Sequence, residues 1–280
     1  MMSDYLDTKR IRALARDLDL KPSKGRGQNF LVDANTVRRI VGHSGVASDD
    51  VVLEIGPGLG SLTVGLLHTG AQVVSVEIEE SLATQLPHTM SDLAGDLAGN
   101  LTVLNTDALT LAAGTATDVP PTTLVANLPY NISVPVILHI LATFPSIQRG
   151  LVMVQLEVAN RLVAPPGSKV YGIPSAKLAW YATSSRVGNV PATVFWPQPH
   201  VESGLVSFER RDPPTGADRD STFTLIDAAF SQRRKMLRSV LSSKYGPSLT
   251  DALKQADIPG EARAETLSID DFARLAIALA

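Results

Sequence analysis

The feature that most constrains the fold is a regular alternation of short apolar runs with helical stretches, beginning near residue 51. Five runs of mainly Val, Leu and Ile have strand length and almost no polar interruption, as expected for strands buried on both faces of a sheet. These runs are VVLEIG (51–56), AQVVSVEI (71–78), LTVLNTD (101–107), TTLVANL (122–128) and GLVMVQL (150–156). Helices are expected between them at 60–69, 79–90 and 134–143, with the repetitive SDLAGDLAGN (91–100) as a surface loop. This alternation predicts an α/β fold with a doubly wound sheet.

The later part of the chain changes character twice. Two β-rich stretches, ATSSRVGNV (182–190) and SGLVSFERR (203–211), are expected to form a closing hairpin, antiparallel at the sheet edge. The segment RRDPPTGADRD (210–220) is rich in Pro, Gly and Asp, which is typical of a linker. Beyond it apolar residues recur at helical spacing, at Phe223, Ile226, Phe230, Leu237, Val240, Leu241, Leu249 and Leu253. We therefore expect a first domain over 1–211 and a small all-helical domain over 212–280.

Composition excludes several kinds of protein. The chain has no Cys, so it has neither disulfides nor thiolate metal sites, and the five His show no metal-ligand spacing. Its N-terminal stretch lacks the uninterrupted apolar core of a signal peptide. No segment approaches the roughly 20 apolar residues of a membrane helix. We expect a soluble, cytoplasmic, monomeric protein without a bound metal.

Basic charge is concentrated in two places, although the net charge is −3. From Lys9 to Arg39 there are nine Lys/Arg against three Asp/Glu, whereas from Ile40 to Asp212 there are seven against fourteen. The remainder has nine of each, and four of its positives fall within 233–238. Such patches can attract a polyanion even on an acidic protein, although solvated helix faces explain the charge pattern equally well.

The first expected strand ends in a glycine-rich turn, LEIGPGLGSLT (53–63), which places Glu54 just ahead of three glycines, Gly56, Gly58 and Gly60. Glycines at this point let the backbone approach a bound nucleotide. The spacing is G-x-G-x-G, not the G-x-G-x-x-G of dinucleotide sites. An acid beside the turn would repel a pyrophosphate but suit a cation, which favours S-adenosylmethionine over a dinucleotide.

Two further acids end the next two strands. Glu77 lies about 20 residues past the glycines, where a carboxylate accepts hydrogen bonds from both ribose hydroxyls of a nucleotide. Asp107 ends the third strand and could accept a hydrogen bond from an adenine amino group. A single acid at a strand end is often only a helix N-cap. Three in succession, where open α/β sheets bind ligands, predict a cofactor site.

The fourth strand ends in LVANLPYNIS (124–133), which is either an ordinary strand-to-helix turn or a platform for a flat ring with an amino group. In the second interpretation, the Asn127 side-chain oxygen and the Leu128 or Pro129 carbonyl accept the two amino hydrogens. The nitrogen lone pair then points at the methyl group, and Tyr130 stacks on the ring. No general base is needed, because the proton can leave after transfer. Positioning and electrostatics would supply the rate.

Eight motifs in order resemble the ribosomal RNA adenine dimethyltransferases, over essentially the whole chain. They are GQNFLVD (27–33), EIGPGLGSLT (54–63), VEIE (76–79), NTDAL (105–109), NLPYNIS (127–133), GSKVYGIPSAKLAWY (167–181), FWPQPHVESGLVSF (195–208) and FSQRRKMLRSVL (230–241). The resemblance implies a Rossmann-like S-adenosylmethionine methyltransferase sheet. It is closest to the branch that dimethylates two adjacent adenosines in a terminal hairpin of small-subunit ribosomal RNA.

The resemblance also implies site residues. Cofactor contacts fall on Asn29, Leu31, Gly56, Glu77, Asp107 and Asn127, and our predicted set adds Glu54, Gly58, Gly60, Ile78 and Ala108. The ring-stacking aromatics fall on Tyr130 and Phe195. Two departures remove positive charge near the expected RNA side: Leu156 stands where the family commonly has Lys, and His200 where a Lys often follows PxP. Neither position carries the methyl-transfer chemistry.

Two basic segments are predicted to meet RNA. The first, beside GRGQNF (25–30), is interpreted as a lid over the cofactor, although it could be a loop that only packs Phe30 into the core. The second, SQRRKMLRS (231–239), is predicted to be an amphipathic helix with Met236, Leu237 and Val240 inward. The predicted RNA contacts are Lys21, Lys24, Arg26, Arg233, Arg234, Lys235 and Arg238. Trp180 and Trp196 are expected to be core or rim packing.

Three alternatives to a small-subunit RNA dimethyltransferase remain open. One is the related branch that methylates large-subunit RNA and confers macrolide resistance, which chain-wide motif agreement and the helical tail disfavour. Another is a ribosome-assembly factor that binds RNA with little or no catalysis, against which the intact Glu77, Asp107 and Asn127 argue. A DNA adenine methyltransferase is the weakest, because no domain for reading a duplex is evident.

Overall fold

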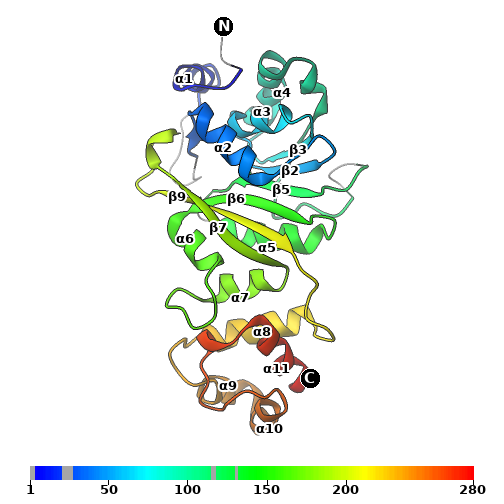
Figure 1. Cartoon of the computed structure of the whole chain (residues 1–280), viewed down its shortest axis with the longest axis vertical. Coiled ribbons are helices and arrows are strands. Elements are labelled where there is room, and N and C mark those ends of the chain that lie inside the picture. Colours follow the sequence, from blue (N-terminus) through cyan, green and yellow to red (C-terminus); the bar gives the residue numbers. More distant parts are fainter. Residues whose placement is uncertain (1–3, 21–27, 115–117, 130–131) are drawn as a thin grey trace. The chain divides into compact units, whose positions relative to one another are not determined.

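The computed structural model describes residues 4–20, 28–114, 118–129 and 132–280. Residue contacts divide the chain into two compact units (Figure 1). Unit 1 comprises Met1–Ala159 and Ser185–Glu209, and unit 2 comprises Asn160–Ser184 and Arg210–Ala280. The crossing at 209–210 lies next to the expected boundary. The contacts also group Asn160–Ser184 with the helical unit, whereas the sequence-based division had assigned this segment to the first domain.

A seven-stranded sheet organises unit 1, in the order β4-β3-β2-β5-β6-β9-β7. Figure 1 follows this order from β3 and β2 in blue, through β5 and β6 in green, to β9 in yellow. The strands are β2 (Val51–Ile55), β3 (Gln72–Glu77), β4 (Leu101–Asn105), β5 (Thr123–Asn127), β6 (Arg149–Gln155), β7 (Ala182–Val190) and β9 (Ser203–Arg210). The first five are parallel to one another, and β9 runs antiparallel to β6. All seven expected strands are confirmed, including the antiparallel strand near the edge.

Strand register brings the functional strand ends together. Glu77, the last residue of β3, is opposite Asn105, the last residue of β4. Ile55 at the end of β2 pairs with Ala126, so Asn127 at the end of β5 extends one residue further. Because parallel strands end at the same edge, these residues share one edge of the sheet.

The helices of unit 1 are α1 (Thr8–Asp17), α2 (Ala34–Ser44), α3 (Ser61–Leu67), α4 (Glu80–Ala94) and α5 (Ser133–Thr143). The last three confirm the expected helices. The expected surface loop at 91–100 was wrong: α4 continues to Ala94, and a 3-10 helix, η2 (Gly95–Asn100), follows directly. Leu93 and Leu97 pack against the core, which holds this segment in helical form.

A separate two-stranded ribbon is not part of the seven-stranded sheet. Strand β1 (Phe30–Leu31) pairs antiparallel with β8 (Phe195–Trp196), and a 3-10 turn, η3 (Ala192–Val194), leads into β8. The Ser61 hydroxyl at the start of α3 donates a hydrogen bond of 2.6 Å to the Leu31 carbonyl. The ribbon is therefore tied to the turn that follows β2.

Unit 2 is helical, with α7 (Ile173–Ala179), α8 (Arg219–Phe230), α9 (Leu237–Tyr245), α10 (Ser248–Gln255), η4 (Ala264–Thr266) and α11 (Ile269–Ala278), while α6 (Leu156–Leu162) crosses between the units. Its core includes the tilted aromatic pair Phe230 and Phe272, and Trp180 packs edge-on against Phe223. These helices confirm the expected helical domain. In the described part of the chain, no helix is long and apolar enough to cross a membrane.

The expected helix over 231–239 was only partly right. Residues 231–235 form turns, and α9 begins at Leu237. Met236, expected inward, is 38% exposed, and its backbone forms an isolated β-bridge with Arg263. Leu237 is buried as expected, and Val240 is partly buried. Backbone pairing to a distant segment has overridden the helical pattern at this point.

Candidate functional site

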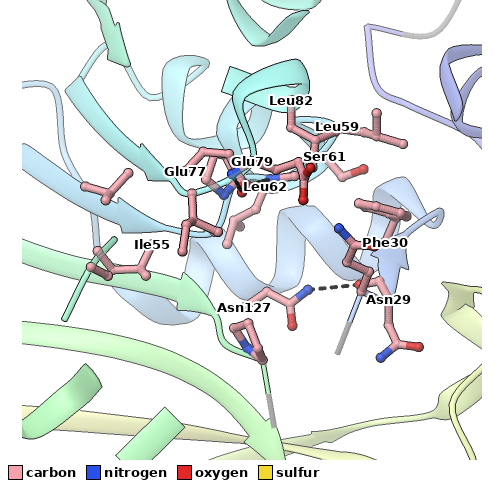
Figure 2. Close-up of a pocket in the computed structure, with 18 of the residues that line it drawn as sticks. Asn29, Phe30, Ile55, Leu59, Ser61, Leu62, Glu77, Glu79, Leu82 and Asn127 are labelled. Atoms are coloured by element: carbon pink, nitrogen blue, oxygen red, sulfur yellow. Dashed lines mark hydrogen bonds between the residues drawn. The ribbon is translucent and has the colours of Figure 1, made fainter. Parts of the chain in front are cut away.

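A cavity of about 560 Å³ opens at the carboxyl edge of the sheet, and we call it the carboxyl-edge pocket (Figure 2). Its walls come from the ends of β2, β3, β4 and β5 and from the segment around β1. The lining residues that had been predicted are Asn29, Leu31, Gly56, Gly58, Glu77, Ile78, Asp107, Ala108, Asn127 and Pro129. A cavity of this size lies in the range of small-molecule and cofactor sites. The position is the one where open α/β sheets bind ligands.

The turn after β2 needs its glycines for backbone geometry. Gly56 and Gly58 have φ values of +69° and +58°, which side chains rarely adopt. A Cβ at Gly58 would lie 2.9 Å from Cε1 of Phe30, so the turn and the β1 segment can approach closely only without that atom. Gly60 has φ of +96° and is not among the lining residues. A Cβ at Gly60 would lie 2.6 Å from Cε of Met90 and 2.8 Å from Cδ1 of Leu86, so the missing Cβ makes room for these two side chains.

Glu77 is fixed by the backbone around it. Its Oε2 accepts a hydrogen bond from Gly58 N at 3.1 Å, and its Oε1 accepts one from Glu79 N at 3.0 Å. The residue is 7% exposed, and burial raises the pKa of its carboxyl despite these bonds. Each oxygen accepts one backbone bond and has further acceptor capacity. Glu77 is therefore a pre-positioned acceptor on the pocket wall, as Figure 2 shows.

Glu54, which was predicted to contact the cofactor, lies in the core. It is 1% exposed and does not line the pocket. Its Oε2 accepts hydrogen bonds from the Ser75 hydroxyl at 2.7 Å and the Thr63 hydroxyl at 2.8 Å. Burial raises the pKa of this carboxyl to about 7. The proposed electrostatic reason for favouring a cationic cofactor through Glu54 therefore does not apply.

Asp107 follows β4 and turns its side chain back onto its own loop. The Leu109 N–H donates to Oδ1 at 2.9 Å, which leaves Oδ2 available. Ala108 beside it is 7% exposed, whereas Ile78 on the neighbouring strand end is 68% exposed. Together these residues give the pocket one carboxylate and two apolar contacts at the β3–β4 end.

Asn127 is a polar residue on the pocket wall at the end of β5. Its Nδ2 donates a hydrogen bond of 3.3 Å to the Asn29 carbonyl, drawn as the dashed line in Figure 2. In the described part of the chain its Oδ1 accepts no hydrogen bond. The amide orientation follows from the donor bond, since only Nδ2 can donate to a carbonyl. An acceptor without a partner among the described residues thus lies on the wall of a cavity that is also lined by Glu77, Glu79 and Asp107.

The two described residues directly after Asn127 lie in different environments, one on the pocket wall and one in the core. Pro129 lines the pocket, and its carbonyl accepts a long hydrogen bond of 3.4 Å from Ile132 N. Leu128 is 2% exposed, does not line the pocket, and donates its N–H to the Met153 carbonyl. Tyr130 lies outside the described residues.

Phe195 was predicted to stack on the base, and the structure places it in the core and not on the pocket wall. It is 4% exposed, pairs with Leu31 across the β1–β8 ribbon, and belongs to the same hydrophobic cluster as Leu31. The pocket is instead lined by Phe30, which had been considered only as a core anchor. The other lining residues that sequence reasoning missed are Gln28, Ile55, Pro57, Leu59, Ser61, Leu62, Val76, Glu79, Leu82, Thr106 and Ile132. Most are apolar, and apolar residues give no signal that separates a pocket wall from a core.

The predicted RNA contacts fall in two groups. Lys21, Lys24 and Arg26 lie outside the described residues. In unit 2, Arg233 is occupied by structural contacts, with its Nε 3.0 Å from Glu265 Oε2 and its Nη2 donating to the Ser168 carbonyl at 3.1 Å. Three further predicted contacts, Arg234, Lys235 and Arg238, are exposed.

The two departures from the family pattern lie in different environments. Leu156 is partly buried at the start of α6, and His200 is exposed. Within the described residues, no group of three or more His, Asp or Glu is arranged to hold a metal ion.

Comparison with known proteins gives consistent results. The family model described as ribosomal RNA adenine dimethylase matches residues 21–280. A protein named ribosomal RNA small subunit methyltransferase A from Cutibacterium acnes is 55% identical, over 96% of this chain and 93% of the relative. One of the same name from Kineococcus radiotolerans is 52% identical, over 98% and 92%.

Two solved structures share the fold at lower identity. A dimethyladenosine transferase from Plasmodium falciparum superposes with a TM-score of 0.74 at 25% identity, covering 88% of this chain and 95% of the other. The 23S rRNA methyltransferase ErmE gives a TM-score of 0.65 at 27% identity, covering 90% and 99%. With a pocket at the carboxyl edge of the sheet, a free Asn127 oxygen facing it and a family match across nearly the whole sequence, the chain belongs to the ribosomal RNA adenine dimethylase family.

Proposed function

We propose that this enzyme transfers methyl groups from S-adenosylmethionine to the N6 amines of two adjacent adenosines in a hairpin near the 3′ end of small-subunit ribosomal RNA. The observation that carries the proposal is the Asn127 side chain, whose amide nitrogen is held by Asn29 while its oxygen faces the carboxyl-edge pocket. The substrate is RNA in an immature small subunit, and the enzyme acts as a cytoplasmic monomer.

The donor groups of the pocket suit an adenosine-containing cofactor. Glu77 offers acceptor oxygens for the ribose hydroxyls, and its fixed position requires no reordering. Asp107 Oδ2 can accept from the adenine amino group, while Ile78 and Ala108 offer apolar contact to the ring. The positive φ of Gly56 and Gly58 lets the backbone come close to the ligand. S-adenosylmethionine supplies an electrophilic methyl group on a sulfonium.

The protein's own chemical task is to prepare a poor nucleophile. The lone pair of the adenine N6 amine is delocalised into the ring. When Asn127 Oδ1 and the Leu128 or Pro129 carbonyl accept its two hydrogens, the nitrogen becomes more tetrahedral and its lone pair is aimed at the methyl group. Preorganised acceptors of this kind lower the barrier without a general base, and the proton is released after transfer.

RNA contacts complete the proposal. The target base must leave its stack to reach the pocket, and Tyr130 is assigned to stack on it. In unit 2, Arg234, Lys235 and Arg238 are exposed and unpaired within the described residues, which supports contact with phosphates. Arg233 is assigned a supporting role, because Glu265 and Ser168 already occupy its guanidinium.

The proposal is tested by methyl transfer from labelled cofactor to unmethylated small subunits, naked ribosomal RNA and mature ribosomes, with the modified nucleosides located by primer extension. We expect dimethyladenosine at two adjacent positions of the small-subunit hairpin, and the fastest transfer to an immature particle. Methylation of large-subunit RNA alone would support the other branch, to which the 23S enzyme's structural similarity points. Specific binding without transfer would support an assembly factor.

A further inference from the structure

A second cavity of unit 1, about 880 Å³ in volume, lies along α1 and has no role in the proposed chemistry. We call it the α1 groove. One wall is helix α1 and the turn that follows it, and Trp196 of β8 contributes the aromatic surface. Its lining residues are Thr8, Lys9, Arg12, Ala15, Arg16, Asp19, Leu20 and Trp196.

Three cations line this groove from one face of α1. Lys9, Arg12 and Arg16 are spaced i, i+3 and i+7, which aligns them along the helix. All three are exposed, and none forms an ion pair within the described residues. The single lining acid is Asp19, which follows the helix. The groove therefore carries a net positive charge suited to a chain of anions.

Trp196 offers an aromatic surface beside these cations. The ring is half-buried and stacks on Phe30, with centroids 6.4 Å apart and planes at 25°. The Arg12 guanidinium lies 6.0 Å from the indole centroid, at the outer limit of a cation–π contact. Phe30 lines the carboxyl-edge pocket and Trp196 lines the groove, so the stack links one residue of each cavity.

We propose that the α1 groove binds an unpaired nucleotide of the RNA substrate next to the target adenosine, with its base on Trp196 and adjacent phosphates on Lys9, Arg12 and Arg16. This inference rests on the proposed function. A basic groove with an aromatic platform is the typical surface for single-stranded nucleic acid. A duplex would not use the indole, because its bases are already stacked. An acidic peptide could use the cations but gains little from an indole face.

The first test measures stacking directly. The chain has two Trp, and Trp180 lies buried in unit 2, so the variant Trp180→Phe leaves Trp196 as the sole indole fluorophore. With saturating S-adenosylhomocysteine present, a single-stranded RNA oligonucleotide should quench this fluorescence. A duplex of the same sequence and polyglutamate should not. Quenching by polyglutamate alone would overturn the inference in favour of an acidic protein partner.

The second test measures the cations. The variant Arg12→Gln/Arg16→Gln should raise the KM for RNA about tenfold with kcat and cofactor affinity nearly unchanged. Its salt dependence of binding should weaken by about 0.7 in log–log slope for each lost phosphate contact. The matched control is Arg38→Gln, which removes an exposed arginine that lies 4.5 Å from the Tyr5 ring and does not line the groove. It should leave the KM within about twofold.

A third pair of variants separates stacking from packing. Trp196→Phe keeps an aromatic face and should retain RNA affinity, whereas Trp196→Leu should weaken it about tenfold at similar thermal stability. Equal affinities for both variants, or an unchanged KM in the double Arg variant, would overturn the inference while methylation by the unmodified enzyme upholds the proposed function. If the unmodified enzyme methylates no ribosomal RNA, the proposed function itself fails.

Discussion

The carboxylates at the two edges of the central sheet differ in how much of their hydrogen-bonding capacity is filled by the protein itself. At the amino edge, Asp50 is saturated: it accepts from Ala47 N at 2.9 Å, from the hydroxyls of Thr122 and Thr123 at 2.8 and 3.1 Å, and from Arg149 Nη2 at 2.6 Å. At the carboxyl edge, Glu77 is held by two backbone amides, pairs with no cation among the described residues, and lines a cavity.

The contrast separates stability from function. A carboxylate whose acceptor capacity is filled by its own protein contributes to the fold, and nothing remains for a ligand. Polar groups that are fixed in place but still have unused acceptor capacity destabilise the free protein, and a ligand that donates hydrogen bonds to them offsets this loss. Glu77 and the Asn127 oxygen are of this second kind, which is why the site lies at that edge.

The largest expected effect tests whether Asn127 acts on the reaction and not on the fold. Asn127→Ala should lower the single-turnover rate of methyl transfer about 10²–10³-fold, because it removes an acceptor aimed at the reacting amine. Binding of RNA should change little, and so should the melting temperature. Residual transfer above a tenth of the original rate would refute the role assigned to its oxygen.

The carboxyl edge was predictable because strand ends are visible in the sequence. Asn127, Glu77 and Asp107 each end an apolar run, and parallel strands then bring them together. The expected cofactor contact of Glu54 differs from the structure because Glu54 lies within β2, one residue before its end. Side-chain alternation along the strand turns Glu54 toward Thr63 and Ser75. The β1–β8 ribbon was also missed, since strands of two residues carry no periodicity.

Packing between distant segments explains the remaining differences between the sequence-based predictions and the structure. Gly60 matches a cofactor-binding pattern, but its missing Cβ accommodates Met90 of α4, a contact that no local pattern encodes. The repetitive segment before β4 resembles a loop, yet Leu93 and Leu97 find apolar neighbours in the core. The α1 groove depends on a helix and a ribbon far apart in sequence, so only the fold brings Arg12 to Trp196.

The second prediction concerns Glu54, a buried carboxyl group that does not line the carboxyl-edge pocket. Burial raises its pKa from 4.5 to about 7, so the folded protein holds its proton while the unfolded chain has lost it. Stability should therefore fall as pH rises from about 4.5 to about 7, by up to about 3 kcal/mol. Glu54→Gln should remove this dependence, as urea unfolding at pH 5 and pH 8 would measure. An unaltered difference between the two pH values would mean that another group causes it.

The third prediction removes the saturated carboxylate at the amino edge. Asp50→Asn should lower the unfolding free energy at pH 7 by about 2 kcal/mol, a value discounted because Arg149 is 41% exposed. Although burial alone raises the Asp50 pKa, the Ala47 amide, the Thr122 hydroxyl and Arg149 hold that pKa below its usual 3.8. Its contribution is thus present above that pH and lost as pH falls through the lower folded value. Denaturant unfolding measures the change in unfolding free energy, and kcat/KM should stay unchanged. A large fall in activity without a loss of stability would show that the amino-edge carboxylate also serves function.

The smallest expected effect tests the carboxyl edge itself through Glu77→Gln. The replacement keeps one acceptor oxygen but turns an NH₂ group toward either Gly58 N or Glu79 N, where two donors would face each other. Cofactor Kd should rise about tenfold by calorimetry, because a ribose acceptor is lost and the glycine turn is less well fixed. The unfolding free energy should move by less than about 1 kcal/mol, since the lost backbone bond is offset by relief of a buried charge. The matched control, Glu80→Gln, removes the same charge from the exposed first turn of α4 and should leave Kd unchanged. A loss of stability without a change in Kd would place Glu77 with Asp50, as a carboxylate that serves the fold.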